Sequence, residues 1–258
     1  MADRFLKLRT ETSLAEFDLV DGFRLTRLEI AGRRLIVEDT SRGEFWWGAY
    51  LLAPWASTLY GGVVTGTDVI MPLDLGDAAV HGTARRQRFE WTGDRAEAGF
   101  GPDWPCGGVI SVEPTLRPDG LDLVIAVTAG EGEVPAEVGW HPWFPRELDG
   151  VRGEIVLSST PLVQEVDSRD VPTGEWTPRA HGPWNDCLRF LGPATVNWPG
   201  AGSLVVDGGT EYWVLFNDND HGICVEPMTG PARMISSRTA PGDTLSLSIS
   251  LTWIPASA

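Results

Sequence analysis

The chain has 258 residues and a formal net charge of −16, from 36 acidic and 20 basic side chains. An acidic surface repels phosphate, so this charge argues against nucleic acids and anionic membranes as partners and favours a neutral ligand. The three cysteines, Cys106, Cys187 and Cys224, have no metal-ligand spacing and indicate reduced thiols. The sequence shows neither a signal peptide at its start nor an apolar run long enough to cross a bilayer, and it therefore predicts a cytoplasmic protein.

The chain reads throughout as short strands separated by turn residues. Residues 15–39 predict two hairpins, with turns at Asp21-Gly22 and at Gly32. The apolar segment 45–56 is expected to cross the core, and further strands follow up to Leu75 and from His81 to Trp91. Alternation of apolar and polar residues is clearest at 121–128, and strands are also predicted at 154–157, 194–198, 203–206, 212–216 and 245–253.

No window of the chain shows sustained helical periodicity with caps, and there is no internal repeat or linker. The regular spacing of strands therefore predicts one all-β domain over residues 1–258, a large antiparallel β-sandwich. Twelve tryptophans accompany only three tyrosines. Since indole rings stack on the apolar faces of sugars, this excess is a weak indication of a carbohydrate ligand.

Glu226 ends an apolar run and is followed directly by Pro227. In an extended segment, alternation places Ile223 and Val225 on one face and Cys224 and Glu226 on the other. Pro227 holds Glu226 in an extended conformation at the strand end. A rigid, partly desolvated carboxyl of this kind suits a general base, although taken alone a strand-end glutamate is more often a solvated surface residue.

His141 lies in a segment of the same design, where Pro142 follows it at the end of a strand. Alternation places His141 with Gly139 on one face, and the glycine leaves space there for a ligand. An imidazole in this position suits a general acid, because histidine titrates near neutral pH. The alternative is a packed histidine whose ring nitrogens are satisfied by neighbouring groups.

His81 and Arg85 are four residues apart and would share one face of a strand, where they could donate to sugar hydroxyls. The alternative is a histidine at a strand start and a solvated arginine. A His/His/carboxylate metal site made of His81, His141 and Glu226 is also conceivable. Local His-x-His or His-x-x-x-His spacing is missing, so a site without metal is preferred. His181 and His221 are expected on the surface.

Four motifs occur together in order and span most of the chain. They are His81-Gly82 with Arg85, the segment 140–144 (Trp-His-Pro-Trp-Phe), the segment 185–188 (Asn-Asp-Cys-Leu) and the segment 225–231 (Val-Glu-Pro-Met-Thr-Gly-Pro). In this order and approximate spacing they resemble the aldose 1-epimerase, or galactose mutarotase, family. The resemblance implies a β-sandwich of the galactose mutarotase type, with a sugar bound in an open cleft and no cofactor.

Carried over from the family, Glu226 is the base that takes the proton of the anomeric hydroxyl, and His141 is the acid that protonates the ring oxygen. The resemblance also places His81, Asn185, Asp186 and Trp143 at the sugar, with Arg85 as a further donor to its hydroxyls. His81 would hold a ring hydroxyl or share the acid role. It implies an isomerase of carbohydrate metabolism that interconverts the α and β anomers of a free sugar. The partner is then a small-molecule sugar.

The chain departs from the family pattern at two places. Ser57-Thr58 stands where the family often has an Asn-Arg pair, so the expected substrate-clamping guanidinium is absent unless Arg85 replaces it. Asn185 aligns with the family's sugar-binding Asp, and alternation turns Asp186 to the other face. These departures disfavour a phosphorylated sugar, and they leave open a carbohydrate-binding protein of the same fold without catalysis.

Overall fold

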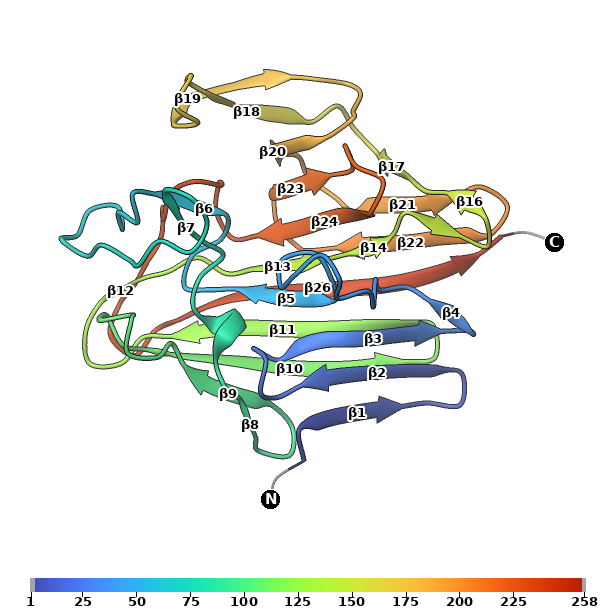
Figure 1. The fold of residues 1–258 in the computed structure, drawn as a ribbon, viewed down its shortest axis with the longest axis horizontal. Coiled ribbons are helices and arrows are strands. Elements are labelled where there is room, and N and C mark those ends of the chain that lie inside the picture. The colour runs from blue at the N-terminus through green and yellow to red at the C-terminus, as the bar shows by residue number, and fades with distance from the viewer. Residues whose placement is uncertain (1–2, 257–258) are drawn as a thin grey trace.

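A computed structural model describes residues 3–256, and nearly all of its regular structure is antiparallel strand. The larger sheet has 12 strands (Figure 1). Its order is β1 (Phe5–Arg9), β2 (Ser13–Asp18), β3 (Arg24–Ile30), β5 (Ala49–Leu52), β13 (Gly139–Pro142), β24 (Gly222–Met228), β23 (Tyr212–Phe216), β20 (Asn185–Arg189), β18 (Leu162–Val166) and β19 (Pro172–Pro178), with β4 (Arg33–Arg34) on β3 and β14 (Phe144–Pro145) on β24.

The second sheet has eight strands. Its order is β17 (Glu154–Leu157), β21 (Ala194–Trp198), β22 (Gly202–Asp207), β26 (Thr244–Pro255), β11 (Gly120–Thr128), β10 (Val109–Arg117), β9 (Ala96–Gly99) and β8 (Glu90–Trp91). Three short pairs complete the strands: β6 (Thr58–Tyr60) with β7 (Ala78–Val80), β12 (Val134–Pro135) with β25 (Arg238–Thr239), and β15 (Glu147–Leu148) with β16 (Val151–Arg152). A single 3-10 turn, η1 (Ala84–Arg86), is the helical element of residues 3–256.

The core lies between the two sheets and is built by alternation. In β11 the apolar residues Leu121, Leu123, Ile125 and Val127 are all buried, and they share one cluster with side chains of the larger sheet. Apolar residues that alternate along the strands give each sheet one apolar face. The two apolar faces are removed from water when the sheets stack on each other. The predicted all-β sandwich is confirmed.

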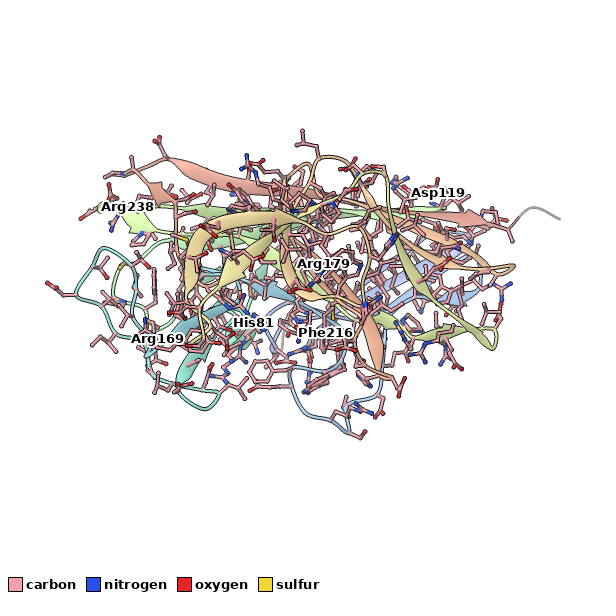
Figure 2. The ribbon with its side chains drawn as sticks, turned by 90° about the horizontal axis from the view of Figure 1, so that it is seen from above. His81, Asp119, Arg169, Arg179, Phe216 and Arg238 are labelled. Carbon is pink, nitrogen blue, oxygen red and sulfur yellow. The ribbon has the colours of Figure 1, made fainter. Side chains whose placement is uncertain are left out.

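The large sheet also carries a second apolar cluster on its other face, with residues from β5, β20 and β24. Cys224 and Met228 belong to this cluster, whereas Ile223 and Val225 of the same strand belong to the core between the sheets. The alternation predicted for 223–226 is therefore confirmed. Figure 2 shows His81 and Phe216 on this outer side of the molecule, away from Asp119 and Arg238.

Two sequence-based boundaries were wrong, whereas the two hairpins predicted over residues 15–39 are confirmed. β2 pairs with β3, and β3 pairs in turn with the two-residue strand β4 across the turn at Gly32. Within the apolar segment 45–56, regular pairing begins only at Ala49, because the positive φ of Gly48 (67°) ends a turn there. No strand starts at His81, since β7 ends at Val80 and the chain then enters η1.

In the described part of the chain, 3–256, no helix has the length and apolar character needed to cross a membrane. The prediction of one domain over 1–258 extends to residues 1–2 and 257–258, which lie outside the described residues, and it stays a prediction.

Candidate active site

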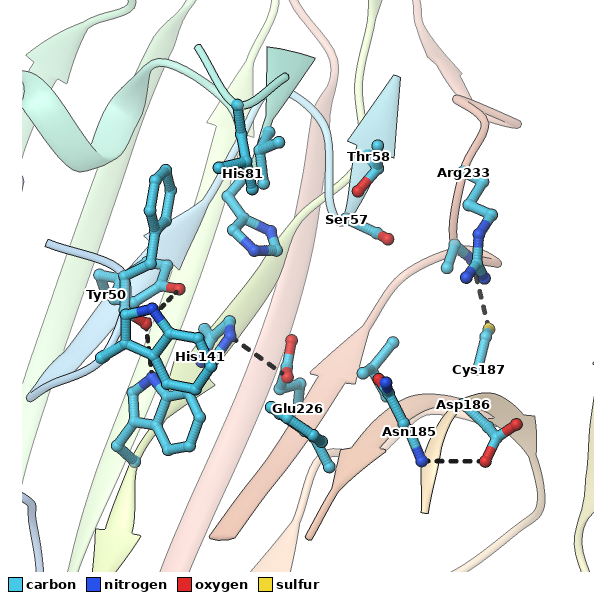
Figure 3. A pocket seen from close by; sticks show the side chains of 18 residues that line it. Tyr50, Ser57, Thr58, His81, His141, Asn185, Asp186, Cys187, Glu226 and Arg233 are labelled. Carbon is cyan, nitrogen blue, oxygen red and sulfur yellow. Dashed lines mark hydrogen bonds and ion pairs between the residues drawn. The ribbon is translucent and has the colours of Figure 1, made fainter. Parts of the chain in front are cut away.

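A cavity of about 320 Å³ opens on the outer face of the large sheet. Its floor comes from β13, β20, β23 and β24, and its walls come from the loops around β6 and β7 and from the loop after β24. Glu226, His141, His81, Trp143, Asn185 and Asp186 all line it (Figure 3). Residues from four distant parts of the sequence therefore meet in one space of a size suited to a small ligand.

Glu226 lies on the floor of the cavity in β24, whose neighbours are β13 and β23. Its residue position pairs with Val214 of β23, and on the other side β24 pairs with β13 two residues further on, at Met228. The side chain is only 3 % exposed, and burial raises the pKa of its carboxyl well above the usual 4.5. The sheet thus presents a rigid, desolvated carboxyl to the cavity, as expected for an acid–base residue.

His141 comes from β13 and points at the same spot, with its Nε2 atom 3.4 Å from Oε1 of Glu226. Its ring stacks on Tyr50, with ring centroids 4.6 Å apart, and lies 5.5 Å from the ring of Trp143. Burial, assisted by nearby His81, lowers the pKa of His141 well below 6.5. Stacking and burial leave the imidazole a single orientation, with Nε2 directed at the carboxyl.

His141 and Glu226 are one coupled acid–base pair. Burial penalises both the carboxylate and the imidazolium, so it raises the pKa of Glu226, lowers the pKa of His141 and favours the uncharged form of each group. The two groups lie close enough, at 3.4 Å, for a proton to pass between them. Such a pair can accept a proton at one atom while it donates a proton from the other.

His81 lines the cavity from the loop after β7. It has a positive φ of 63°, and its ring meets that of His141 edge to face at 5.2 Å. Burial, together with the charge of Arg85, lowers the pKa of His81 to about 3, so the ring is neutral. Its Nδ1 atom is buried and has no hydrogen-bond partner within residues 3–256.

Arg85 does not share a strand face with His81, and its side chain does not line the cavity. The guanidinium is 1 % exposed and donates to Glu44 (2.8 Å), to Asp74 (2.6 Å) and to the carbonyl oxygen of Val80 (3.4 Å). It also lies over the ring of Phe45. The prediction that His81 and Arg85 form a pair of donors to the ligand was therefore wrong. The guanidinium of Arg85 is neutralised by two carboxylates, and it anchors the loop that carries His81.

Asn185 and Asp186 both line the cavity, although alternation predicted opposite faces. β20 begins at Asn185, and the Asp186 carboxylate turns back to accept the backbone N–H of Asn185 at 3.0 Å. It also pairs with Arg179. Trp143 packs against Trp46, with ring centroids 5.1 Å apart, and forms an aromatic wall.

The comparison with solved structures agrees with this architecture. The galactose mutarotase-like protein of Lactobacillus casei ATCC 334 superimposes with a TM-score of 0.77 at 16% identity, covering 96% of this chain and 99% of that one. The chain has the galactose mutarotase fold. An aldose epimerase homologue from C. elegans gives a TM-score of 0.78 at 14% identity over 98% and 99% of the two chains. The galactose 1-epimerase of Lactobacillus acidophilus NCFM gives 0.76 at 13% identity over 98% and 95%.

No family model matches the sequence, and no curated protein sequence matches it significantly. Since identities are this low, the comparison establishes the galactose mutarotase fold and leaves the chemistry to the residues of the site.

Sequence reasoning missed three groups that line this mutarotase-fold cavity or pack against its wall. Trp46 and Tyr50 belong to the apolar segment that was expected to cross the core, yet both line the cavity. His221, expected at the surface, packs its ring 5.3 Å from Trp143 and contacts the carbonyl oxygen of Trp46. Arg233, in the loop after β24, also reaches the cavity. The sequence of that loop carries no pattern that indicates a binding residue.

A metal could be offered ligands by His141, Cys224 and Glu226, whose ligand atoms lie within 4.8 Å of one another. This set differs from the one considered from the sequence, since Cys224 takes the place of His81. Cys224 can bind a metal ion only as a thiolate. Burial raises the pKa of its thiol well above 9.0, and the carboxyl of Glu226 raises that pKa further. The cluster therefore favours proton chemistry over metal binding.

Proposed function

We propose that this protein is an isomerase of the aldose 1-epimerase type, which interconverts the α and β anomers of a sugar by opening its ring. The observation that carries the proposal is the 3.4 Å approach of His141 to Glu226 in a cavity on a galactose mutarotase fold. The reaction needs one group that removes a proton and one that supplies a proton, and it needs no redox partner or nucleotide.

The separation of the two groups suits the atoms that react. In a cyclic sugar the anomeric hydroxyl oxygen and the ring oxygen are both bonded to C1. Glu226 takes the proton of the hydroxyl while His141 gives a proton to the ring oxygen, and the C1–O bond of the ring breaks. The open aldehyde rotates about its C1–C2 bond, and closure on the other face, with the roles of the two residues reversed, gives the other anomer.

The rest of the cavity supports the same assignment. His81 is neutral and offers a hydroxyl-binding nitrogen beside His141. Trp143 and Trp46 present an aromatic surface of the kind on which sugar rings stack. Asn185 adds an exposed amide that can both donate to and accept from hydroxyl groups.

NMR exchange spectroscopy on a panel of aldoses tests the proposal directly. The wild-type protein should accelerate exchange between the anomers of at least one sugar, and Glu226→Gln should slow that exchange by about 100-fold or more. Glu147→Gln is the matched control, because it makes the same chemical change at an exposed position outside the cavity. No acceleration of any sugar, or an unchanged rate in Glu226→Gln, contradicts the proposal.

A sugar-binding protein without catalysis is the second candidate. It is favoured by the burial of Glu226, which raises the pKa of the carboxyl and so favours the protonated form, a hydrogen-bond donor, over the base. Saturable binding of a sugar in calorimetry, with no acceleration of anomer exchange, would identify this function.

A further inference from the structure

Arg233 is held at the cavity wall by a loop that is anchored on both sides. The backbone N–H of Ala232 donates to Sγ of Cys187 (3.3 Å), and its carbonyl oxygen accepts from Gln164 (3.3 Å). The N–H of Ser236 donates to the buried carboxyl of Glu137 (3.0 Å). Between these anchors Arg233 adopts a positive φ of 69°, which is unfavourable for a residue with a Cβ. The loop is thus built to present this side chain.

The guanidinium of Arg233 forms no ion pair with any carboxylate of residues 3–256. Other arginines near the cavity are neutralised: Arg85 by Glu44 and Asp74, and Arg179 by Asp186. Arg233 lies beside the hydroxyl of Tyr60, which donates to the carboxylate of Asp170 at 3.3 Å. The positive charge of Arg233 is therefore available to a ligand.

The other ionisable groups of the cavity leave this charge uncompensated. Asp186 is paired with Arg179, the His141–Glu226 pair is uncharged as a unit, and His81 is neutral. Among the groups that face Arg233, burial and nearby Asp170 raise the pKa of Tyr60, and burial raises that of Cys187 to about 12, so both are neutral. The cavity thus carries one net positive charge in a chain of net charge −16.

We propose that Arg233 binds the carboxylate of a sugar acid, so that this site acts on uronic acids in preference to neutral aldoses. Figure 3 shows Arg233 across the cavity from His81, with Ser57 and Thr58 on one side and Asn185 on the other. These neutral groups can donate the remaining hydrogen bonds to a carboxylate. A single guanidinium matches one negative charge, whereas a phosphate dianion calls for several converging cations.

The inference rests on the proposed function for the position of the sugar ring, but the charge selection can be measured by binding alone. Calorimetry with D-glucuronate and D-glucose compares two sugars that differ by one carboxylate, and NMR exchange on the same pair gives the ratio of their kcat/KM values. Wild type should favour the uronate, and Arg233→Met should reduce that preference by about 10- to 100-fold. Arg88→Met is the control, because it removes one exposed arginine charge outside the cavity.

Four outcomes decide the matter. A uronate preference that Arg233→Met removes and Arg88→Met keeps supports the inference. Equal affinity for both sugars, or a preference that survives Arg233→Met, overturns it even where anomer exchange is accelerated. Binding of D-glucose 6-phosphate more tightly than D-glucuronate overturns the carboxylate assignment. Arg233-dependent binding of uronate without any anomer exchange supports the charge selection and overturns the proposed isomerase function instead.

Discussion

The Nε2 atom of His141 lies 3.4 Å from Oε1 of Glu226, and the strands that carry them pair at Gly139 and Met228. This register brings both side chains to the same depth of the cavity. Because both groups are buried and lie this close together, the protonation of each depends on that of the other. The effects of substitutions and of pH on the rate are therefore properties of the pair rather than of either residue.

The first prediction is that substitutions in the pair are not additive. Glu226→Gln and His141→Asn should each slow anomer exchange by about 100-fold or more, because either change removes one end of the proton relay. The double variant should be slower than the worse single variant by only a few-fold, since groups that act as a unit are lost together. Rates from NMR exchange at matched protein concentration check this. Multiplicative losses would show that the two residues act separately.

The second prediction concerns the pH dependence of the rate. As pH falls, the pair gains a second proton only below the ordinary histidine pKa of 6.5, because burial lowers the pKa of His141. As pH rises, it loses its last proton well above 4.5, because burial raises the pKa of Glu226. The kcat/KM profile should therefore be a broad plateau across neutral pH. A half-maximal rate near pH 6.5 would instead indicate an independently titrating, solvated histidine.

The third prediction concerns Glu137, a fully buried carboxyl that supports the loop carrying Arg233. Burial raises its pKa from 4.5 to about 8, despite hydrogen bonds from the backbone and side chain of Ser236. Since the pKa is higher in the folded state, its contribution to stability is full below pH 4.5. That contribution is lost as pH rises through about 8, by a free energy on the order of 5 kcal/mol.

Glu137→Gln should therefore flatten the dependence of stability on pH. The uncharged amide keeps the size of the side chain and can still accept from Ser236, but it has no proton to lose. Urea unfolding at several values between pH 5 and pH 9 measures the difference. If wild type and variant lose stability in parallel over this range, Glu137 does not titrate as described.

The fourth prediction is that Arg85 stabilises the fold rather than binding the ligand. Arg85→Met should lower the free energy of unfolding by about 2–4 kcal/mol, because it leaves Glu44 and Asp74 without their buried partner. Arg86→Met, which removes a half-exposed neighbour of the same two carboxylates, should cost less than about 1 kcal/mol. Equal costs in denaturant titrations would contradict the buried role of Arg85.

The fifth prediction concerns the backbone that carries His81. Gly82 has a φ of +70°, and a Cβ there would lie 2.0 Å from the carbonyl oxygen of Ala53, so Gly82→Ala must displace the loop. We expect a loss of more than about 3 kcal/mol in unfolding free energy. Gly76→Ala has a similar φ of +60° but meets no atom within 4 Å, and should cost only about 1–2 kcal/mol. Similar losses would show that the positive φ, rather than the contact with Ala53, determines the loss of unfolding free energy.

Much of the fold and part of the candidate site could be predicted from the sequence. The alternation around Glu226 and His141 correctly assigned each side chain to a face, because strand geometry is local and its period is two. The same rule failed at Asp186. The strand begins only at the preceding residue, Asn185, and the Asp186 carboxylate turns back to accept the backbone N–H of Asn185. It also failed at His81, whose positive φ places it in a loop.

The sequence by itself determined the all-β architecture, the strand end at Pro142, and the outward direction of His141 and Glu226, since these depend on residues close together in the chain. The strand end predicted at Pro227 was wrong, because β24 runs on to Met228. Only the tertiary structure decided that these two side chains meet, because that depends on the register of β13 against β24. The tertiary structure also decided which arginine is neutralised. Arg85 pairs with carboxylates and Arg233 does not, because the paths of the loops determine which guanidinium lies beside a carboxylate.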